Sequence, residues 1–419
     1  MKLNSSAAAL AAACVLLATS PAATPSSSQA RAEVFEGVVK AVSEQFYDPA
    51  FHGVNWSEVQ ARYRTRLDQV TDDAGLQQLI TQMLAELKSS HLYVYRTTPG
   101  VKGGLAARIE PVEGADTVLE LAPLSDARAQ GLRPGDRIVG GVAALDGPAG
   151  TLADVAVQRC DGASTRLKIR RERWLFPEEH PGWRWARIRV APEKAIGYIR
   201  VDRFDDGAAE LADRAMEELG STQGLVIDVR TNSGGNISAM RLASYFIDRK
   251  GPVFALLSRP YLERLGRQVT AADVAAGPKV IGRYRGEDVM EALSKGHGAA
   301  TFYAEDLGDK RYRAPVVVLI GPGTGSAAEG FAWGMKTFSR ARLVGAPTAG
   351  AILSGDDLEV APGWRLTLPV AGHWSAGGED LNDKPVTPHE LVPETRADIC
   401  AGRDRGAERA IAILAAGFG

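Results

Sequence analysis

The sequence predicts a multi-domain α+β protein, and three changes of pattern along its 419 residues support this fold class. Residues 31–96 carry apolar side chains at helical spacing. Residues 97–175 consist of short apolar runs separated by many glycines, and residues 176–419 alternate apolar strands with amphipathic helices. We therefore expect an N-terminal helical bundle, a small β domain and a layered α/β domain, because strand–helix alternation is typical of such layers.

Composition and charge limit the classes of function. Hydrophobic residues make up 45% of the chain, charged residues 24%, and the net charge is −2. These values are those of an ordinary globular protein, and no basic run is long enough to predict nucleic-acid binding. No apolar stretch after the first thirty residues predicts a membrane span.

The first thirty residues are typical of a secretory signal peptide. Lys2 precedes an apolar run from Ala7 to Ala18, and small residues follow it. This pattern predicts a periplasmic or secreted protein, with cleavage after Ala22 or Ala30. Cys14 could be a lipidation site, but the apolar run continues beyond it, which disfavours that alternative.

Three helices are expected in the N-terminal region, covering residues 34–46, 56–70 and 73–87. Each has one apolar face, and Pro49 follows the end of the first. The pair Ser90-His91 comes directly after the third helix and before an apparent strand at residues 92–95.

The glycine-rich segment 97–175 resembles a PDZ domain. The turn Gly103-Gly104-Leu105-Ala106 matches the loop that receives a peptide's terminal carboxylate, and residues 134–138 (PGDRI) match the turn before a later strand. The resemblance implies capture of a peptide tail by pairing with an exposed strand edge. The alternative is a small β domain that only packs, and Gly140-Gly141-Val142 departs from the usual ending of the motif.

Ser326 lies on a glycine-rich turn between a predicted buried strand at 315–320 and a predicted helix at 327–338. A serine on such a turn can expose its hydroxyl beside backbone N–H groups that have no partner within the helix. Ser326 and Glu329 also form the pattern of a capping box, which would be structural. Both interpretations, nucleophile and helix cap, fit the segment taken alone.

A second glycine-rich turn, Gly234-Gly235, follows another predicted buried strand at 225–229. Paired glycines allow close approach of a ligand, although a tight turn would need them equally. The polar segment 250–313 interrupts the strand–helix alternation and is expected to be a lid, a binding loop or a second layer.

Three segments together resemble the carboxy-terminal processing peptidase and tricorn-core family of serine peptidases: residues 226–235 (VIDVRTNSGG), 323–329 (GTGSAAE) and 344–350 (VGAPTAG). The resemblance covers nearly the whole chain after the signal. It implies a crotonase/ClpP-like layered α/β catalytic domain over residues 176–419. It also implies a serine endopeptidase that cuts exported polypeptides, with the PDZ-like domain holding their carboxy-terminal tails, and no cofactor.

Two chemical versions of this family exist, and the resemblance favours the tricorn-like one. Ala351 stands where the Ser–Lys version has its lysine, and Lys336 lies roughly 15 Å along the helix from Ser326. Ser90-His91 matches the tricorn-like pair, in which His91 is the general base. His91 could instead be an incidental surface histidine; the other five histidines match no such motif.

In that version a further acidic residue orients the base. Asn382 aligns with this acid and departs from the pattern. Asp383, Glu379 or Asp380 could serve instead, or an amide could orient the base. This member of the site is left open by the sequence.

The oxyanion hole is expected to combine the N–H of Ala327 with an N–H of Gly234 or Gly235. No metal site is expected, because the sequence has no His-x-x-x-His pair and no close cysteine cluster. Cys160 and Cys400 could pair or remain free thiols.

Two competing functions remain from the sequence. One is a non-catalytic ligand- or peptide-binding relative with the same fold. The other is an acyl-CoA enzyme of the crotonase type, which the signal peptide and the PDZ-like segment disfavour.

Overall fold

The computed structural model describes residues 27–97, 102–142, 145–172 and 182–417. Most of the predicted signal peptide, including Cys14, lies outside these residues. Helix α1 begins at Ser28. Cleavage after Ala22 would leave this helix whole, whereas cleavage after Ala30 would remove its first three residues.

The larger unit is built on a mainly parallel sheet. Its strands follow the order β19-β16-β15-β11-β10-β9, and only β9 runs antiparallel to its neighbour. The strands are β9 (Trp183–Ala191), β10 (Lys194–Val201), β11 (Gly224–Asp228), β15 (Val316–Ile320), β16 (Arg342–Gly345) and β19 (Glu390–Leu391). Such a sheet is expected to be buried on both faces, which explains the continuous apolar runs of β11 and β15.

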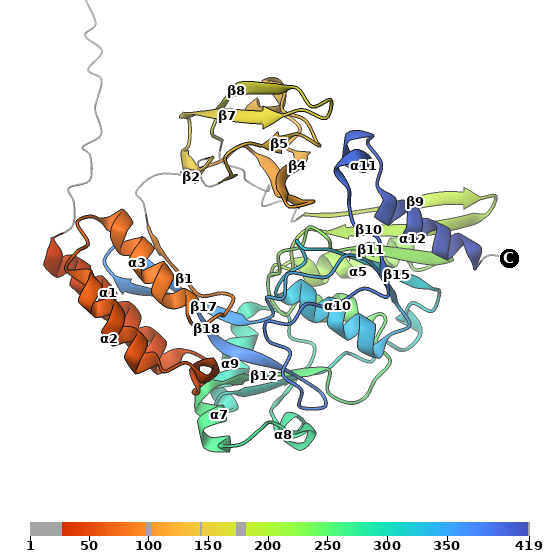
Figure 1. Ribbon diagram of the computed structural model, residues 1–419. Coiled ribbons are helices and arrows are strands. Elements are labelled where there is room, and N and C mark those ends of the chain that lie inside the picture. Colours follow the sequence, from red (N-terminus) through yellow and green to blue (C-terminus); the bar gives the residue numbers. More distant parts are fainter. Residues whose placement is uncertain (1–26, 98–101, 143–144, 173–181, 418–419) are drawn as a thin grey trace, which may run out of the picture.

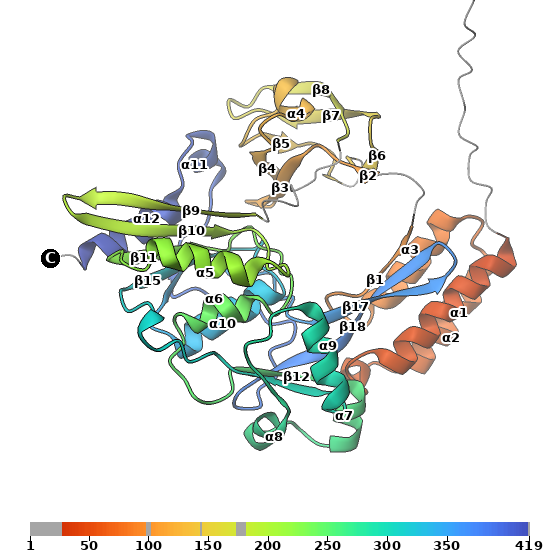
Figure 2. The ribbon, with the colours of Figure 1, turned by 180° about the vertical axis from the view of Figure 1, so that it is seen from behind.

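Helices cover both faces of this sheet (Figures 1 and 2). In β11, Leu225 and Ile227 belong to the core shared with α5 (Ala208–Leu219), α6 (Ala239–Ser244) and α10 (Ala327–Phe338). Val226 points to the opposite face, where Leu414 of α12 (Arg405–Ala416) packs. Side chains alternate between the two faces of a strand, so one strand supplies both cores.

The polar insertion contributes three strands to a second sheet of six strands. The strands of this sheet are β1 (Tyr93–Arg96), β12 (Phe254–Ser258), β13 (Lys279–Val280), β14 (Ala299–Phe302), β17 (Ser354–Ala361) and β18 (Trp364–Ser375). Three helices accompany them: α7 (Arg259–Leu265), α8 (Ala271–Ala276) and α9 (Gly286–Lys295). Of the three expectations for residues 250–313, the second layer is therefore correct.

The N-terminal helices pack on this second sheet and do not form a bundle with a core of their own. Buried residues of α1 (Ser28–Gln45), α2 (Trp56–Leu67) and α3 (Asp73–Ala85) share one cluster with Leu366 and Leu368 of β18. Each helix is short and has a single apolar face, so the sheet supplies the apolar surface that the helices lack.

Residues 102–172 form a separate β domain with its own core of residues such as Val118, Val157 and Ile169. Its main sheet has the order β3-β4-β5-β7-β8, which makes β3 an edge strand. The elements are β2 (Lys102–Gly103), β3 (Ala107–Val112), β4 (Ala115–Leu121), α4 (Asp126–Ala129), β5 (Arg137–Ile138), β6 (Gly147–Pro148), β7 (Leu152–Gln158) and β8 (Ser164–Arg170).

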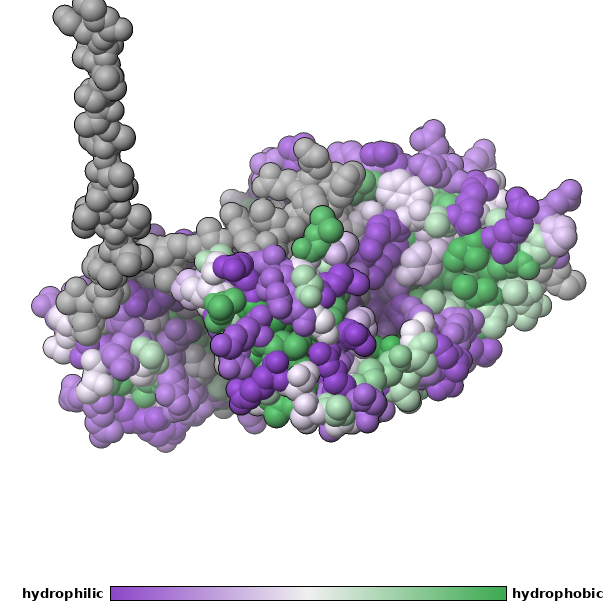
Figure 3. Space-filling view, turned by 90° about the horizontal axis from the view of Figure 1, so that it is seen from above, coloured by the Kyte–Doolittle hydropathy of each residue, from purple (hydrophilic) through white to green (hydrophobic). Residues whose placement is uncertain are grey.

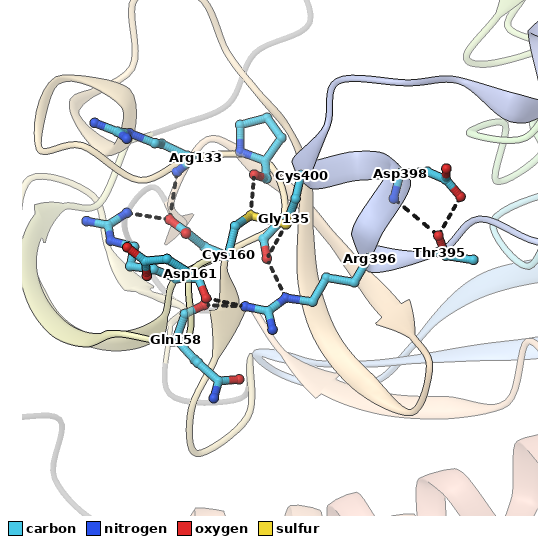
Figure 4. Close-up of a disulfide and its surroundings, with 12 residues drawn as sticks. Arg133, Gly135, Gln158, Cys160, Asp161, Thr395, Arg396, Asp398 and Cys400 are labelled. Carbon is cyan, nitrogen blue, oxygen red and sulfur yellow. Dashed lines mark hydrogen bonds and ion pairs between the residues drawn. A yellow bond between two sulfur atoms is a disulfide. The ribbon is translucent and has the colours of Figure 1, made fainter.

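A disulfide between Cys160 and Cys400 joins the β domain to α11 (Arg396–Cys400) (Figure 4). Beside it, the Arg396 guanidinium donates hydrogen bonds to the carbonyl oxygens of Gly135, Gln158 and Arg159. Residue 135 has to be glycine, because a Cβ there would lie 2.6 Å or less from both sulfur atoms. Cys160 and Cys400, whose pairing the sequence did not decide, thus form a disulfide.

Hydrophilic side chains dominate the face shown in Figure 3, and apolar residues form separate patches on it. In the part of the chain that the structure describes, no helix combines the length and apolar character needed to cross a bilayer.

Candidate active site

Ser326 lies on the turn between β15 and α10, in a backbone conformation that few residues adopt. Its φ is 49° and its ψ is −121°, and its backbone carbonyl accepts the N–H groups of Glu329 and Gly330 in α10 at 2.9 and 3.1 Å. Such a conformation costs about 1–3 kcal/mol and is found preferentially at functional sites. Ser326 is half-buried and lines a cavity.

Gly234 packs directly against this serine. A Cβ at position 234 would lie 2.6 Å from the Cβ of Ser326, and the φ of Gly234 is +123°. The Asn232 side chain accepts the Gly234 N–H at 2.8 Å, and the Asn232 carbonyl accepts the N–H of Gly325. The two glycine-rich turns of the sequence therefore lie against each other.

Glu329 explains the capping pattern around Ser326. Its buried carboxylate accepts hydrogen bonds from the N–H of Ser326 at 3.2 Å and from the N–H groups of Gly350 and Ala351 at 2.7 and 2.6 Å. The Thr348 hydroxyl also donates to it. Burial raises the pKa of Glu329, and these donors act in the opposite direction. Glu329 thus fixes the serine turn to residues 348–351.

Neither lysine position considered in the sequence supplies a base. Ala351 occupies the place of the lysine, and its carbonyl accepts the N–H of Ser326 at 3.1 Å. Lys336 donates instead to the carbonyl and hydroxyl oxygens of Thr387, at 2.7 and 2.9 Å.

His91 and Ser326 line the same cavity, which has a volume of about 560 Å³. His91 Nδ1 lies 3.2 Å from the hydroxyl oxygen of Ser90. Burial lowers the pKa of His91, and the negative charge of Asp383 opposes this effect. Among the described residues no hydrogen bond joins Ser326 to His91. Hydrogen bonds of catalytic groups are often long before substrate binds.

Of the four candidates for the orienting acid, Asp383 contacts the Ser90-His91 pair. Its Oδ1 accepts the backbone N–H of Ser90 at 3.1 Å. Asn382 has a different environment: its Oδ1 accepts the N–H of His373, and its Nδ2 donates to Asp380. The carbonyl of Glu379 accepts the N–H of Ser375, and the N–H of Glu379 donates to the Ser375 hydroxyl.

The proposed oxyanion donors differ in their availability. The Gly234 N–H is already donated to Asn232. Gly235 and Ala327 both line the cavity with Ser326, and in the described part of the chain their N–H groups have no hydrogen-bond acceptor. Gly235 is also sterically required, because a Cβ there would lie 2.0 Å from the carbonyl oxygen of Phe204.

Sequence reasoning missed His373, which lies on β18 and lines the same cavity. Burial, together with the nearby His91, lowers the pKa of His373 to about 3, so its ring is neutral at ordinary pH. No local motif marks this residue. Only the pairing of β18 with β12 brings it to the cavity.

The PDZ-like turn lies in the β domain, away from this cavity. Gly103 belongs to β2, and Gly104 exchanges two backbone hydrogen bonds with Glu172. Leu105 and Ala106 are buried. The β domain approaches the serine turn through β3. The Glu110 carboxylate of β3 lies so near Gly323 that a Cβ at this residue would be 2.9 Å from one of its oxygens.

No group of three or more histidine, cysteine, aspartate or glutamate side chains placed to hold a metal ion occurs in the described segments.

Comparison with known proteins adds independent information. Residues 195–392 match the family described as Peptidase family S41, and residues 27–85 match the Tricorn protease C1 domain. Tricorn protease homolog 1 of Streptomyces coelicolor is 24% identical over 432 residues, which cover 92% of this chain and 35% of that protein. The chloroplastic C-terminal processing peptidase of Tetradesmus obliquus is 25% identical over 401 residues, covering 86% of this chain and 78% of that protein. The chain thus spans about a third of the tricorn homologue and most of the processing peptidase.

Solved structures show the same fold. The photosystem II D1 C-terminal processing protease aligns with a TM-score of 0.57 at 22% identity, covering 87% of this chain and 93% of that one. Mature CPAF aligns with a TM-score of 0.61 at 15% identity, covering 92% and 97%.

These likenesses define the class of the protein as a serine-type peptidase. Residues 195–392 form a peptidase family S41 domain, and the resemblance drawn from the three sequence segments is confirmed.

Proposed function

We propose that the protein is a serine endopeptidase in which Ser326 is the nucleophile and His91 is the general base. The observation that carries this proposal is that both residues line one cavity, with Ser326 on a turn whose φ is positive. Ser326, His91 and Asp383 all have positive φ values of 49–55°. Residues other than glycine rarely adopt this backbone conformation, and those that do are found preferentially at functional sites.

The reaction follows from the contacts around His91. In the tautomer that carries its proton on Nδ1, His91 donates a hydrogen bond from Nδ1–H to the Ser90 hydroxyl oxygen, and the lone pair of Nε2 is free to take the proton of the Ser326 hydroxyl. The Ser326 oxygen then attacks the peptide carbonyl carbon. His91 passes the proton to the leaving amine, and the C–N bond breaks. Water, deprotonated by His91, hydrolyses the ester and restores Ser326.

Two backbone groups are proposed to stabilise the oxyanion: the N–H groups of Ala327 and Gly235. The Gly234 N–H is less suited, because Asn232 already accepts it. One donor of this kind typically contributes about 2.7–4 kcal/mol to the transition state. Asp383 acts indirectly, since it holds Ser90 and raises the pKa of His91.

The β domain is proposed to be a PDZ-like domain that holds a substrate's carboxy-terminal tail. β3 is an edge strand, so an extended peptide can pair with its free side. The contact of Glu110 on β3 with the turn at Gly323 supports communication with the serine site. The two-layered arrangement of sheets and helices supports the proposed crotonase/ClpP-like core.

A periplasmic or secreted location is proposed from the predicted signal peptide and from the disulfide between Cys160 and Cys400. Disulfides persist mainly in oxidising compartments.

Labelling with a fluorophosphonate probe, combined with digestion of an unfolded polypeptide, tests the proposal. The wild-type protein should be labelled and should cut the substrate, whereas Ser326→Ala should do neither. Ser339→Ala, at the other end of α10, is the matched control and should retain both activities. Undiminished cleavage by Ser326→Ala would overturn the assignment. A substrate with a free carboxyl terminus should be cut faster than its amidated form if the tail is held.

One alternative function is a non-catalytic ligand- or peptide-binding protein with this fold. The absence of a hydrogen bond between Ser326 and His91 in the described structure is the observation that favours it. That protein would leave Ser326 unlabelled and the polypeptide intact.

A further inference from the structure

The cavity beside Ser326 has two kinds of lining. Polar groups, among them Ser326, His91 and Asn236, form one part of it. The rest is apolar and comes from α6, β12, α9 and α10: Met240, Phe254, Leu256, Met290, Leu293 and Phe331. The volume of about 560 Å³ lies within the range of about 300–1,000 Å³ typical of pockets that enclose small molecules, so it can take a large side chain.

The charged residues of this cavity lie on its exposed part. Among the described lining residues, the acidic and basic ones are Arg203 and Asp356, and both are exposed. Arg203 donates to the carboxylate of Asp205 at 2.7 Å, and Asp356 accepts the N–H of Asp357 at 2.8 Å. His373, the second histidine of the lining, is neutral at ordinary pH because burial holds its pKa near 3.

Helix α9 forms a fixed wall of the cavity. The carboxylate of Asp206 accepts the N–H of Gly286 at 3.3 Å, at the start of α9, and also bonds the side chain of Asn236. Leu293 is 8% exposed, whereas Met290 is 52% exposed. Asp206 therefore ties α9 to the turn that carries Gly235, and the flexible Met290 side chain lies on its accessible part.

The residue whose carbonyl is attacked has its side chain two bonds from the reacting carbon, so this side chain lies beside Ser326, within reach of the cavity. Resting on the proposed peptidase function, we propose that this cavity binds the residue on the amino side of the cut bond and selects large apolar side chains such as Phe, Leu and Met. Apolar contact favours these residues. A charged side chain buried among the apolar lining residues would have no partner there and would be disfavoured.

Hydrolysis of a peptide series that differs only at this residue tests the proposal. With identical flanking residues, the kcat/KM values for Phe, Leu and Met should exceed that for Ala by about 10- to 200-fold. Lys and Asp should be cut no faster than Ala. Equal values across the series, or a preference for Ala, Lys or Asp, would overturn the selectivity while leaving the peptidase function intact. Failure to cut any peptide or to label Ser326 would overturn both.

A charge placed on α9 gives a second measurement that does not depend on the choice of peptides. Met290→Asp should raise the ratio of Lys to Phe cleavage by about fivefold, because a partly exposed ion pair is weak. Met290→Leu should leave the ratio unchanged. Leu391→Asp, the same kind of change at an exposed residue outside the lining, controls for added negative charge. An unchanged ratio in Met290→Asp, with unfolding temperatures equal across the variants, would contradict the proposed role of this wall.

Discussion

Asp383 accepts a hydrogen bond from the backbone N–H of Ser90 at 3.1 Å, although 293 positions separate them in the chain. This contact connects the loop after β18 to the loop before β1, and β1 and β18 pair in the second sheet. The carboxylate reaches the proposed base through its neighbour and not through the ring itself. An acid in this position is expected to orient His91 and to influence its charge.

Replacing the acid should slow the reaction without abolishing it. Asp383→Asn is expected to lower kcat by about 10- to 100-fold, less than the roughly 10⁴-fold loss seen where an acid bonds the histidine directly. Glu379→Gln removes another carboxylate that the sequence allowed and should leave kcat unchanged. Steady-state kinetics of both variants on one peptide, with unfolding temperatures measured in parallel, show which of the two carboxylates affects kcat. A loss in Glu379→Gln instead would assign the role to that residue.

The acid limb of the pH profile should lie below the ordinary pKa of histidine, about 6.5. His91 works as a base only when neutral, and burial lowers its pKa, so activity should persist below pH 6.5 and fall as the pH passes this lowered pKa. His373 adds no charge over this range. Asp383 raises the pKa of His91, so Asp383→Asn should shift the limb further toward acid. Profiles of kcat/KM from about pH 4 to 8 would show this; a shift in the opposite direction would contradict it.

Because the two glycine-rich turns pack closely, adding one methyl group at residue 234 should strongly lower the catalytic rate. Gly234→Ala would place a Cβ 2.6 Å from that of Ser326. Because a displacement of about 1 Å can cost 10²-fold in rate, we expect at least this loss in kcat. Gly150→Ala is the control: it also has a positive φ, but its Cβ would meet open space. Normal activity in Gly234→Ala would mean that the serine tolerates displacement.

Loss of the buried carboxylate beside Ser326 should destabilise the fold. Glu329→Ala would leave the N–H groups of Gly350 and Ala351 and the hydroxyl of Thr348 without their acceptor. Since one buried unsatisfied donor costs about 1–3 kcal/mol, the free energy of unfolding should fall by at least about 3 kcal/mol. Urea titration measures this change.

Glu287→Ala on α9 provides the comparison for that titration, because its side chain is 77% exposed. Its unfolding free energy should change by no more than about 0.5 kcal/mol. Equal stability of the two variants would show that Glu329 has no special structural role.

Local pattern was enough to predict the serine turn, because Ser326, its strand and its helix are adjacent in the sequence. It was also enough to place Ser90-His91 just before a strand. The choice between Asn382 and Asp383 was not accessible, since neighbouring residues of a loop point in different directions according to tertiary contacts. The same holds for His373, which reaches the cavity only through sheet pairing, and for Cys160 and Cys400, whose approach depends on how two domains sit together.

The N-terminal helices illustrate another limit. Their periodicity predicts helices correctly but does not show what covers their apolar faces. Leu366 and Leu368, which cover them, lie near the other end of the chain. For this reason a separate bundle was expected, and a shared core was found.

The bond between Cys160 and Cys400 also has a consequence for the order of maturation. The β domain can fold as soon as its own residues have been made, because its core is self-contained. Its covalent attachment to α11 has to wait until Cys400, 240 positions after Cys160, has been synthesised and the pair has met an oxidant. The newly made protein therefore passes through a stage in which the folded β domain is held beside the rest by its chain connections and by noncovalent contacts, such as the ion pair of Glu120 with Arg200, and the disulfide then makes this arrangement permanent.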